Sequence, residues 1–256
     1  MLYGVCCVPV SPVKKDPSHT SEMVSQLLFG ERCTLLETFQ DNWIKIQGKA
    51  DGYVGWCLLS HIANIDEDEF DVKELTFTVK QSTSIQYDHQ RMLLPLGSCI
   101  TGLRKGQGRS GNISVEYHGK LWRPGDTNIS GKKIEKIAMK FINTPYLWGG
   151  KSVFGIDCSG LSQAVYKFFN IHLPRDSWQQ AELGDTIPNL EKGKRGDLIF
   201  FDNQQGKIIH VGILLKQNKI IHASGKVRID QVDRDGIINL STNKRTHHLC
   251  LIKRYF

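Results

Sequence analysis

The sequence predicts an α+β protein in which small β-barrels come first and a mixed domain, with helices ahead of an antiparallel sheet, follows. Three observations support this prediction. Residues 1–128 contain short runs rich in β-branched and aromatic residues, separated by turn residues. After them come two stretches with apolar residues at helical spacing, and then four stretches of strand character. Helices followed by strands are typical of an α+β domain.

The strands expected in the first half are short and closely spaced. In order they are CTLLETF (33–39), NWIKIQG (42–48), GYVGWCLL (52–59), LTFTVK (75–80), SCITGL (98–103) and ISVEYHGKLWR (113–123). Such spacing predicts small barrels rather than helical layers. The acidic segment 65–71 interrupts the strands, and we interpret it as a link. We therefore predict one barrel at residues 1–66 and a second at 67–128.

The character of the chain changes in the third predicted domain, residues 129–256. Residues 131–142 and 158–169 each place apolar side chains on one helical stripe. The strand-like runs that follow are DLIFF (197–201), IIHVGILL (208–215), KIIHAS (219–224) and HHLCLIKRYF (247–256). This order predicts two helices that pack on an antiparallel sheet.

Charge and cysteine content exclude several classes of function. The chain has a net charge of +7, but its basic residues are mostly interspersed with acidic ones. Its densest basic segment, residues 102–111, is rich in glycine, so we interpret it as a solvated hairpin loop and expect no nucleic-acid partner. The seven cysteines are scattered and form no CxxC pair, which argues against a disulfide framework or a zinc site. We expect no metal or organic cofactor.

The sequence also bears on the location of the protein. No apolar run reaches the roughly 18 residues that a membrane span requires, so we expect no membrane association. The opening MLYGVCCVPVSPVKKD lacks the basic start, long apolar core and cleavage site of a signal peptide. If this is the natural start, the unpaired thiols predict a cytoplasmic protein, and we expect a monomer.

One cysteine differs from the other six in its neighbours. Cys158 lies in GIDCSG at the start of a predicted helix, where the helix dipole favours a nucleophilic thiolate. A lone cysteine in an apolar helix is more often a core residue, so a base is needed to support a catalytic role. His210 and His222 lie within apolar strand-like runs, and a Cys–His pair with a third group that orients the imidazole is a nucleophilic arrangement.

The two histidines can cooperate only under one geometric condition. If residues 217–218 closed a two-residue hairpin, His210 and His222 would point to opposite faces of the sheet, because side chains alternate along strands. Shared chemistry therefore predicts an odd-length loop or a bulge between the two strands.

With these residues in place, the last domain resembles the NlpC/P60 family of papain-like cysteine peptidases. The matching pieces are TPYLWGG (144–150), GIDCSGL (155–161), LPRDSWQQ (173–180), KRGDLIFF (194–201), HVGILL (210–215) and IIHAS (220–224). The resemblance implies that Cys158 is the nucleophile, His210 the general base and His222 the residue that orients the base. It also implies an oxyanion site near the Cys158 backbone N–H, assisted by Tyr146.

The first half resembles two bacterial SH3 domains, so the expected fold class is a papain-like NlpC/P60 catalytic domain preceded by two small SH3-like β-barrels. The pieces SEMVSQLLFGE (21–31), NWIKI (42–46) and DGYVGW (51–56) carry the first resemblance, and GKLWR (119–123) supports the second. This organisation is similar to that of the dipeptidyl-peptidase VI type. The resemblance implies a γ-D-glutamyl-L-diamino acid endopeptidase that acts on peptidoglycan peptides with a free N-terminal L-alanine.

A free ammonium group needs an acid and a hydrogen-bond acceptor. The resemblance implies that the first SH3 domain supplies them through Tyr53 and Glu22, with Asp51 as the alternative acid. Four residues of the last domain also match positions that line the substrate pocket: Asp157, Ser159, Asp176 and Ser177. Capping of the helix remains the other reading of Asp157, and pairing with Arg175 is the other reading of Asp176.

Two other functions fit the same residues. The fold also resembles those of acyltransferases and wall amidases, so the bond or the acceptor could differ. Rapid cleavage of an N-acetylated substrate would favour that alternative. A binding module with a catalytically silent peptidase domain is the second alternative, against which the intact Cys158, His210 and His222 argue.

Overall fold

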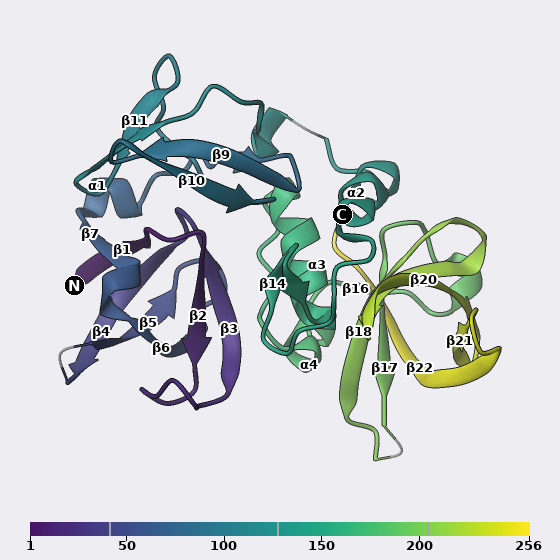
Figure 1. The fold of residues 1–256 in the computed structure, drawn as a ribbon. Coiled ribbons are helices and arrows are strands. Elements are labelled where there is room, and N and C mark those ends of the chain that lie inside the picture. The colour runs from purple at the N-terminus through teal and green to yellow at the C-terminus, as the bar shows by residue number, and fades with distance from the viewer. Residues whose placement is uncertain (41, 127, 204) are drawn as a thin grey trace. The chain divides into compact units, whose positions relative to one another are not determined.

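The computed structural model describes residues 1–40, 42–126, 128–203 and 205–256. The chain forms two compact units, each described by itself below (Figure 1). The first unit comprises Met1–Asp126 and Trp148–Phe154, and the second comprises Thr127–Leu147 and Gly155–Phe256. The domain boundaries proposed from the sequence stay a prediction. No helix among the described residues is long and apolar enough to cross a membrane.

The first unit begins with a seven-stranded antiparallel sheet in the order β3-β2-β6-β5-β4-β1-β7. Its strands are β1 (Leu2–Cys6), β2 (Val10–Lys14), β3 (Met23–Leu28), β4 (Arg32–Phe39), β5 (Trp43–Gly48), β6 (Val54–Leu58) and β7 (Ile62–Ile65), with the 3₁₀ turn η1 (Leu59–His61) before β7. Cys33, Ile44, Ile46 and Cys57 lie on the buried face and form its core, because alternate residues of a strand face the same side. The three strands predicted between residues 33 and 59 are confirmed.

The second part of this unit has a four-stranded sheet in the order β10-β9-β12-β11 and a two-stranded ribbon, β13-β8. The strands are β8 (Phe77–Thr78), β9 (Ser82–Tyr87), β10 (Gln90–Pro95), β11 (Gln107–Ser110), β12 (Ile113–Glu116) and β13 (Leu121–Trp122), followed by the 3₁₀ turn η2 (Pro124–Asp126). The unit also contains β14 (Lys151–Ser152). Phe29, in the turn directly after β3, is buried with Ile85, Leu94 and Ile100 of the second part, so the two parts share a core.

Two expectations for this region need correction. The strand predicted at residues 98–103 is wrong, because its backbone bonds go to separate partners: Cys99 N donates to Phe29 O at 2.8 Å, and Ile100 N donates to Thr76 O at 2.9 Å. The basic segment 102–111 is a hairpin loop only in its first half. Its second half forms β11, which pairs with β12.

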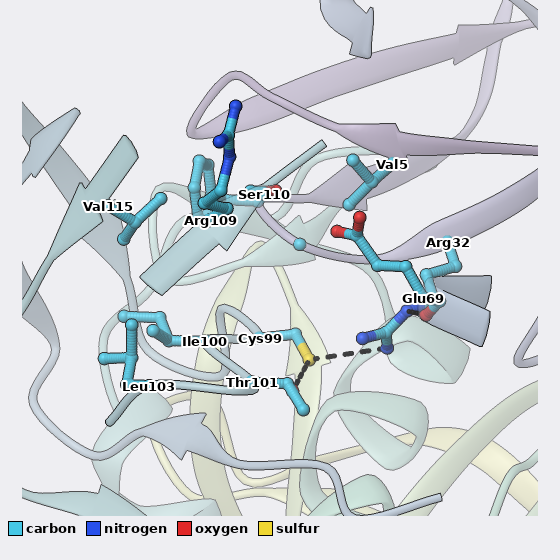
Figure 2. A pocket seen from close by; sticks show the side chains of 12 residues that line it. Val5, Arg32, Glu69, Cys99, Ile100, Thr101, Leu103, Arg109, Ser110 and Val115 are labelled. Atoms are coloured by element: carbon cyan, nitrogen blue, oxygen red, sulfur yellow. Dashed lines mark hydrogen bonds between the residues drawn. The ribbon is translucent and has the colours of Figure 1, made fainter. Parts of the chain in front are cut away.

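The predicted link contains a short helix, α1 (Glu67–Phe70), capped by Asp66. The Glu69 carbonyl accepts a hydrogen bond from Arg32 Nε at 2.7 Å, and its carboxylate accepts one from Gly111 N at 3.0 Å. A cavity of about 20 Å³ lies beside these contacts, with Cys99 on its wall (Figure 2). A space of this size holds a single water molecule, so the cavity belongs to the packing of the unit and is too small for a ligand.

The second unit contains a closed barrel. Its sheet has the order β16-β22-β17-β18-β19-β20-β21, and β21 also pairs with β22, which closes six strands on themselves (Figure 1, green to yellow). The strands of this sheet are β16 (Asp185–Thr186), β17 (Leu198–Asp202), β18 (Ile208–Leu214), β19 (Lys219–Ser224), β20 (Lys226–Asp233), β21 (Gly236–Asn239) and β22 (Lys244–Arg254), and β15 (Gly155–Ile156) lies outside it. Ile199, Phe201, Leu214 and Ile220 belong to a fully buried apolar cluster of these strands.

Helices cover this barrel. They are α2 (Gly131–Ala138), α3 (Cys158–Tyr166) and α4 (Ser177–Ala181), with the 3₁₀ turns η3 (Met139–Phe141), η4 (Lys167–Phe169), η5 (Leu190–Lys192) and η6 (Lys216–Asn218). α3 packs against β18 and β19. The apolar stripe predicted for it is buried, with Leu161 and Val165 fully inaccessible to solvent. The two helices and the strands predicted for this part of the chain are confirmed.

Candidate active site

Cys158 is the first residue of α3. Asp157 precedes it in an extended conformation, and its Oδ1 accepts a hydrogen bond from Gly160 N at 2.7 Å. This N-cap fixes where the helix begins, because it pairs a backbone N–H that has no partner within the helix. α3 packs against β18, and the backbone of Val211, which directly follows His210 in β18, is close enough to the Cys158 thiol to lower its pKa. The helix start therefore lies against the strand that carries the predicted base.

His210 and His222 point to the same side of the sheet. β18 and β19 pair with Gly212 opposite His222 and Leu214 opposite Ile220, so His210 lies diagonally across from His222. The connection is the three-residue turn η6 (Lys216–Asn218), which confirms the predicted odd-length loop.

A glycine makes the diagonal contact possible. A Cβ atom at Gly212 would lie 3.0 Å from the Cβ of His222 and 2.6 Å from Cδ1 of Ile220. The absence of a side chain at Gly212 leaves room beside His222. The His222 Nδ1 atom lies 2.8 Å from Nε2 of His210. Both imidazoles are buried, with 6% of His210 and 1% of His222 exposed.

Other rings surround the base. His247 of β22 stacks on His210 with ring centroids 4.3 Å apart, and Phe201 lies 5.8 Å away. Burial lowers the pKa of His210 well below its ordinary value of 6.5, and the neighbouring His222 and His247 lower it further. The base is therefore a neutral imidazole near neutral pH, ready to accept a proton.

The expectation that the start of the helix makes Cys158 a thiolate is wrong. Burial and the neighbouring charge of Asp157 raise the pKa of the thiol to about 12, although hydrogen bonds from Val211 and Ser159 and the charge of Arg175 oppose this rise. Desolvation of the sulfur outweighs the helix dipole, whose effect at one helix end is modest. The resting site thus holds a thiol beside a neutral imidazole.

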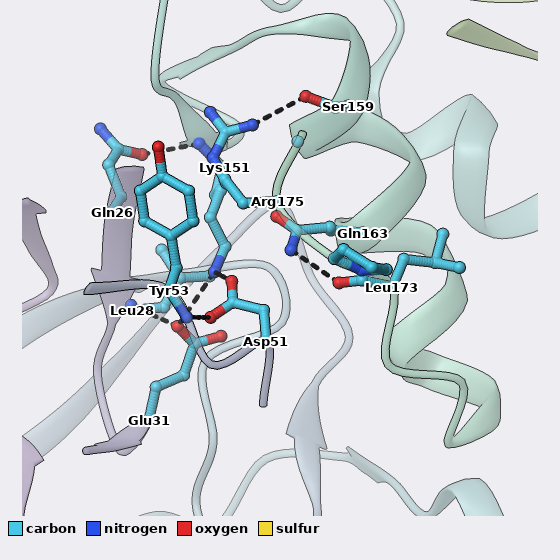
Figure 3. Close-up of polar contacts among 12 residues, drawn as sticks. Gln26, Leu28, Glu31, Asp51, Tyr53, Lys151, Ser159, Gln163, Leu173 and Arg175 are labelled. Atoms are coloured by element: carbon cyan, nitrogen blue, oxygen red, sulfur yellow. Dashed lines mark hydrogen bonds and ion pairs between the residues drawn. The ribbon is translucent and has the colours of Figure 1, made fainter. Parts of the chain in front are cut away.

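The other candidates in this unit lie around the start of α3. Asp157 is buried and forms an ion pair with Arg175, whose Nη2 lies 2.5 Å from Oδ2, and Arg175 Nη1 also donates to Ser159 Oγ at 2.8 Å (Figure 3). Asp176 caps α4 in a capping box, and Ser177 is the first residue of that helix. Asp157 therefore has two structural roles: it caps α3 through Gly160 N and it pairs with Arg175.

Tyr146 completes this group. Its side chain is 37% exposed, and its backbone N donates to Gly225 O at 3.0 Å. Burial raises the pKa of Tyr146 to about 12, and the charges of Cys158 and Asp157 add to the rise. The phenol therefore stays protonated and can donate a hydrogen bond to a developing oxyanion.

The remaining candidates belong to the first unit. Glu22 is exposed and accepts a hydrogen bond from the indole of Trp148 at 2.7 Å. The side chain of Asp51 is buried, with Lys151 Nζ 3.4 Å from its carboxylate, and the carboxylate also accepts from Tyr53 N at 3.1 Å (Figure 3). The charge of Asp51 is therefore compensated within the protein, whereas Glu22 faces solvent.

The sequence reasoning missed Asp230 of β20. Its Oδ2 lies 3.0 Å from His222 Nε2, at the end of the line that begins at His210. The available signal was a carboxylate within VRIDQV (227–232), a run whose Val227, Ile229 and Val232 give it strand character. Among the described residues, no group of three or more His, Cys, Asp or Glu side chains is arranged to hold a metal ion.

Acid is expected to weaken the folded state. Burial lowers the pKa of His247 from 6.5 to about 4. Between these values only the unfolded chain binds the proton, so stability falls as the pH drops below 6.5, by roughly 1–2 kcal/mol at pH 5. Urea unfolding at about pH 7.5 and pH 5 measures this loss.

A matched pair of variants isolates the contribution of the ring. His247→Gln should lose less stability over this pH interval than the wild type. Thr246→Ala keeps the His247 ring and removes only a hydroxyl 2.9 Å from it. Its stability should therefore fall between about pH 7.5 and pH 5 by as much as that of the wild type. Equal pH dependence in His247→Gln and the wild type would contradict the assignment.

Comparisons with known proteins identify the family of each part of the chain. The NlpC/P60 family model matches residues 143–246, and the bacterial dipeptidyl-peptidase SH3 domain model matches residues 13–62. A γ-D-glutamyl-L-lysine dipeptidyl-peptidase of Bacillus subtilis is 28% identical over 91% of this chain and 81% of its own length. A probable endopeptidase of Haemophilus influenzae is 38% identical over 44% of this chain and 70% of its own length.

Solved structures of NlpC/P60 proteins also match the chain over nearly its whole length. An NlpC/P60 family protein from Bacillus cereus has a TM-score of 0.82 and 20% identity and covers 99% of both chains. Together with the family models, this match confirms the expected fold class.

Proposed function

Because the chain belongs to the NlpC/P60 family, we propose that it hydrolyses the bond between γ-D-glutamate and the following diamino acid in short peptidoglycan peptides. It is a cysteine peptidase, and relatives that align along most of the chain are γ-D-glutamyl-L-lysine dipeptidyl-peptidases. The observation that carries the proposal is the buried imidazole pair of His210 and His222, on β18 and β19, the two strands against which the helix of Cys158 packs.

The resting protonation states determine the first step. His210 Nε2 is occupied by His222, so Nδ1 is the nitrogen that remains to accept a proton. The Cys158 proton moves to this nitrogen as the sulfur attacks the γ-carbonyl carbon. Because the proton moves during the attack, the free enzyme need not form a thiolate–imidazolium pair of Cys158 and His210. The raised pKa of the thiol disfavours such a pair.

The later steps use groups already in place. The carbonyl oxygen becomes an oxyanion that accepts hydrogen bonds from the Cys158 backbone N–H and the protonated Tyr146 hydroxyl. The imidazolium of His210 protonates the departing amine, which leaves the diamino acid and an acyl-enzyme. Water, deprotonated by the same imidazole, then releases L-Ala-γ-D-Glu.

The free amino end of the substrate supplies the specificity in this proposal. Glu22 and Tyr53 are the groups proposed to bind the ammonium group, because an exposed carboxylate can pair with it. Asp51 is the weaker candidate, since Lys151 already neutralises its charge.

Incubation with L-Ala-γ-D-Glu-L-Lys tests the proposal. We expect release of L-Ala-γ-D-Glu, and cleavage of the N-acetylated peptide at least about 100-fold more slowly, because an uncharged amide leaves the carboxylate unpaired. Glu22→Gln should reduce this discrimination. Glu37→Gln should not, since Glu37 pairs with Lys45 on the surface of the same sheet. Mass spectrometry of the products measures both rates.

Each other outcome identifies an alternative. Equal cleavage of the free and acetylated peptides would remove the amine-binding role and favour an amidase or acyltransferase. No cleavage by a folded protein would favour the binding module.

We also propose that the enzyme acts in the cytoplasm, on peptides that are recycled or used as nutrients. The seven free cysteines support this proposal, because reduced thiols persist in a reducing compartment. Cell fractionation with detection of the protein in the membrane-free lysate tests it, and enrichment in the culture medium would exclude it.

A further inference from the structure

The imidazole pair is extended by a buried carboxylate. Asp230 faces Ile220 across the β19–β20 pairing, two residues from His222, and only 1% of it is exposed. Its Oδ2 lies 3.0 Å from His222 Nε2, and His222 Nδ1 lies 2.8 Å from His210 Nε2. Three side chains from three successive strands thus form one line of hydrogen bonds.

The partners of Asp230 determine the direction of these hydrogen bonds. Oδ1 accepts from Leu240 N and from Arg228 Nη2, both at 2.9 Å, and Arg228 Nε lies 2.8 Å from Oδ2. Burial raises the pKa of this carboxyl, but the hydrogen bonds from His222, Leu240 and Arg228 outweigh it and lower the pKa to about 2. An ionised carboxylate can only accept, so His222 Nε2 must carry a proton.

The direction of the remaining bonds follows. A neutral His222 protonated at Nε2 can only accept at Nδ1, so His210 Nε2 donates to it. His210 Nδ1 is then left without a proton, which is the state that a base requires. We infer that Asp230 is a positioning residue that holds both imidazoles in the tautomers needed for proton transfer from Cys158. This inference rests on the proposed function.

The surroundings of Asp230 give it a fixed position. Arg228 Nη2 also donates to Asn239 Oδ1 and Ser241 Oγ, both at 3.1 Å, so it joins β20 to the turn after β21. His247 is the other titratable ring near the pair, with its centroid 6.0 Å from that of His222. The negative charge of Asp230 also favours the imidazolium that forms when Cys158 gives up its proton.

A nearby ion pair provides a comparison. Asp233 lies on the same strand and forms a two-point ion pair with Arg245, at 2.7 and 2.8 Å, on the surface. It also accepts from backbone N–H groups of its turn, at Asp235 and Gly236. Asp233 thus has the same kinds of partner as Asp230, an arginine and backbone N–H groups, but its side chain is exposed and makes no contact with the imidazole pair. It therefore serves as the control.

Asp230→Asn tests the role in catalysis. The amide oxygen should face Leu240 N and Arg228 Nη2, which can only donate, and the NH₂ group should face His222, which can change tautomer. His222 then donates from its Nδ1 to His210 Nε2. The proton of His210 therefore moves to its own Nδ1, the atom that would otherwise accept the proton of Cys158. We expect kcat to fall about 10²- to 10⁴-fold while KM changes less than about threefold. Asp233→Asn should keep both values within about threefold of the wild type.

A measurement on the wild-type protein needs no substrate. Two-bond ¹H–¹⁵N correlation spectra distinguish the two neutral tautomers of histidine from imidazolium. We expect His222 and His210 both to carry their proton on Nε2 near pH 7, and His222 to carry it on Nδ1 in Asp230→Asn. Wild-type His222 found as the Nδ1–H tautomer, or as imidazolium, would overturn the inference, as would an unchanged kcat in a folded Asp230→Asn variant.

The kinetics of the variant and the spectra of the wild type separate this inference from the proposed function. If Asp230→Asn does not fold, the spectra of the wild type decide the inference. If the wild type cleaves no γ-D-glutamyl peptide, the proposed function fails, and the same spectra still support or overturn the role of Asp230.

Discussion

Replacement of Cys158 by alanine is expected to reduce hydrolysis of L-Ala-γ-D-Glu-L-Lys by about 10⁴-fold or more. The sulfur is the atom proposed to bond to the γ-carbonyl carbon, and the remaining imidazoles and hydrogen-bond donors cannot form the acyl-enzyme without it. Initial rates of L-Ala-γ-D-Glu release measure the loss. Circular dichroism checks that the variant is folded. We expect that it is, because the substitution removes only one small side-chain atom.

Another thiol serves as the control. Cys250→Ala removes an exposed cysteine of β22, so its activity should remain close to that of the wild type. Activity that survives Cys158→Ala, or is lost in both variants, would exclude Cys158 as the nucleophile.

Replacement of Arg175 by methionine is expected to lower the free energy of unfolding by about 3–5 kcal/mol. Arg175 is 2% exposed and pairs with the buried Asp157, so the substitution leaves a carboxylate in the interior without its cation. The same change removes the hydrogen bond to Ser159 Oγ, next to the nucleophile. Urea unfolding at neutral pH, followed by tryptophan fluorescence, measures the loss.

Two further variants test the cause. Asp157→Asn added to Arg175→Met should recover part of the stability, because the asparagine removes the unpaired charge and can still cap α3. Arg245→Met breaks the surface ion pair with Asp233 and should lower the free energy of unfolding far less than Arg175→Met, because water screens an exposed pair. A loss in Arg175→Met no larger than that in Arg245→Met would show that the buried pair adds no more to stability than the surface pair.

Local pattern was sufficient for the strands that surround the active site. The runs at 197–201, 208–215 and 219–224 became β17, β18 and β19, with ends that differ by at most one residue. Their apolar residues are continuous and bounded by turn residues, as in strands buried on both faces. β20 was missed because polar residues outnumber apolar ones in it, and the burial of Asp230 is explained only by partners distant in the chain, His222 and Leu240 N.

The first unit was harder to predict for a related reason. β9 and β10 were missed because few of their side chains are buried, with Ile85 the one fully buried residue of β9. The predicted strand at 98–103 has apolar residues, but its backbone groups bond to Phe29 and Thr76 rather than to one neighbouring strand. Pairing of this kind depends on residues far away in the chain, which local propensity does not describe.

The sequence by itself determined where the chemistry begins: a cysteine behind an aspartate cap, two histidines in neighbouring strands, and a loop whose odd length puts both rings on one side. These features depend on residues close together in the chain, whose geometry follows from helix and strand periodicity. Only the tertiary structure decided the protonation of Cys158 and the partners of Asp157 and His222. Burial and strand register bring distant residues together, and their electrostatic effects outweigh those of the local helix.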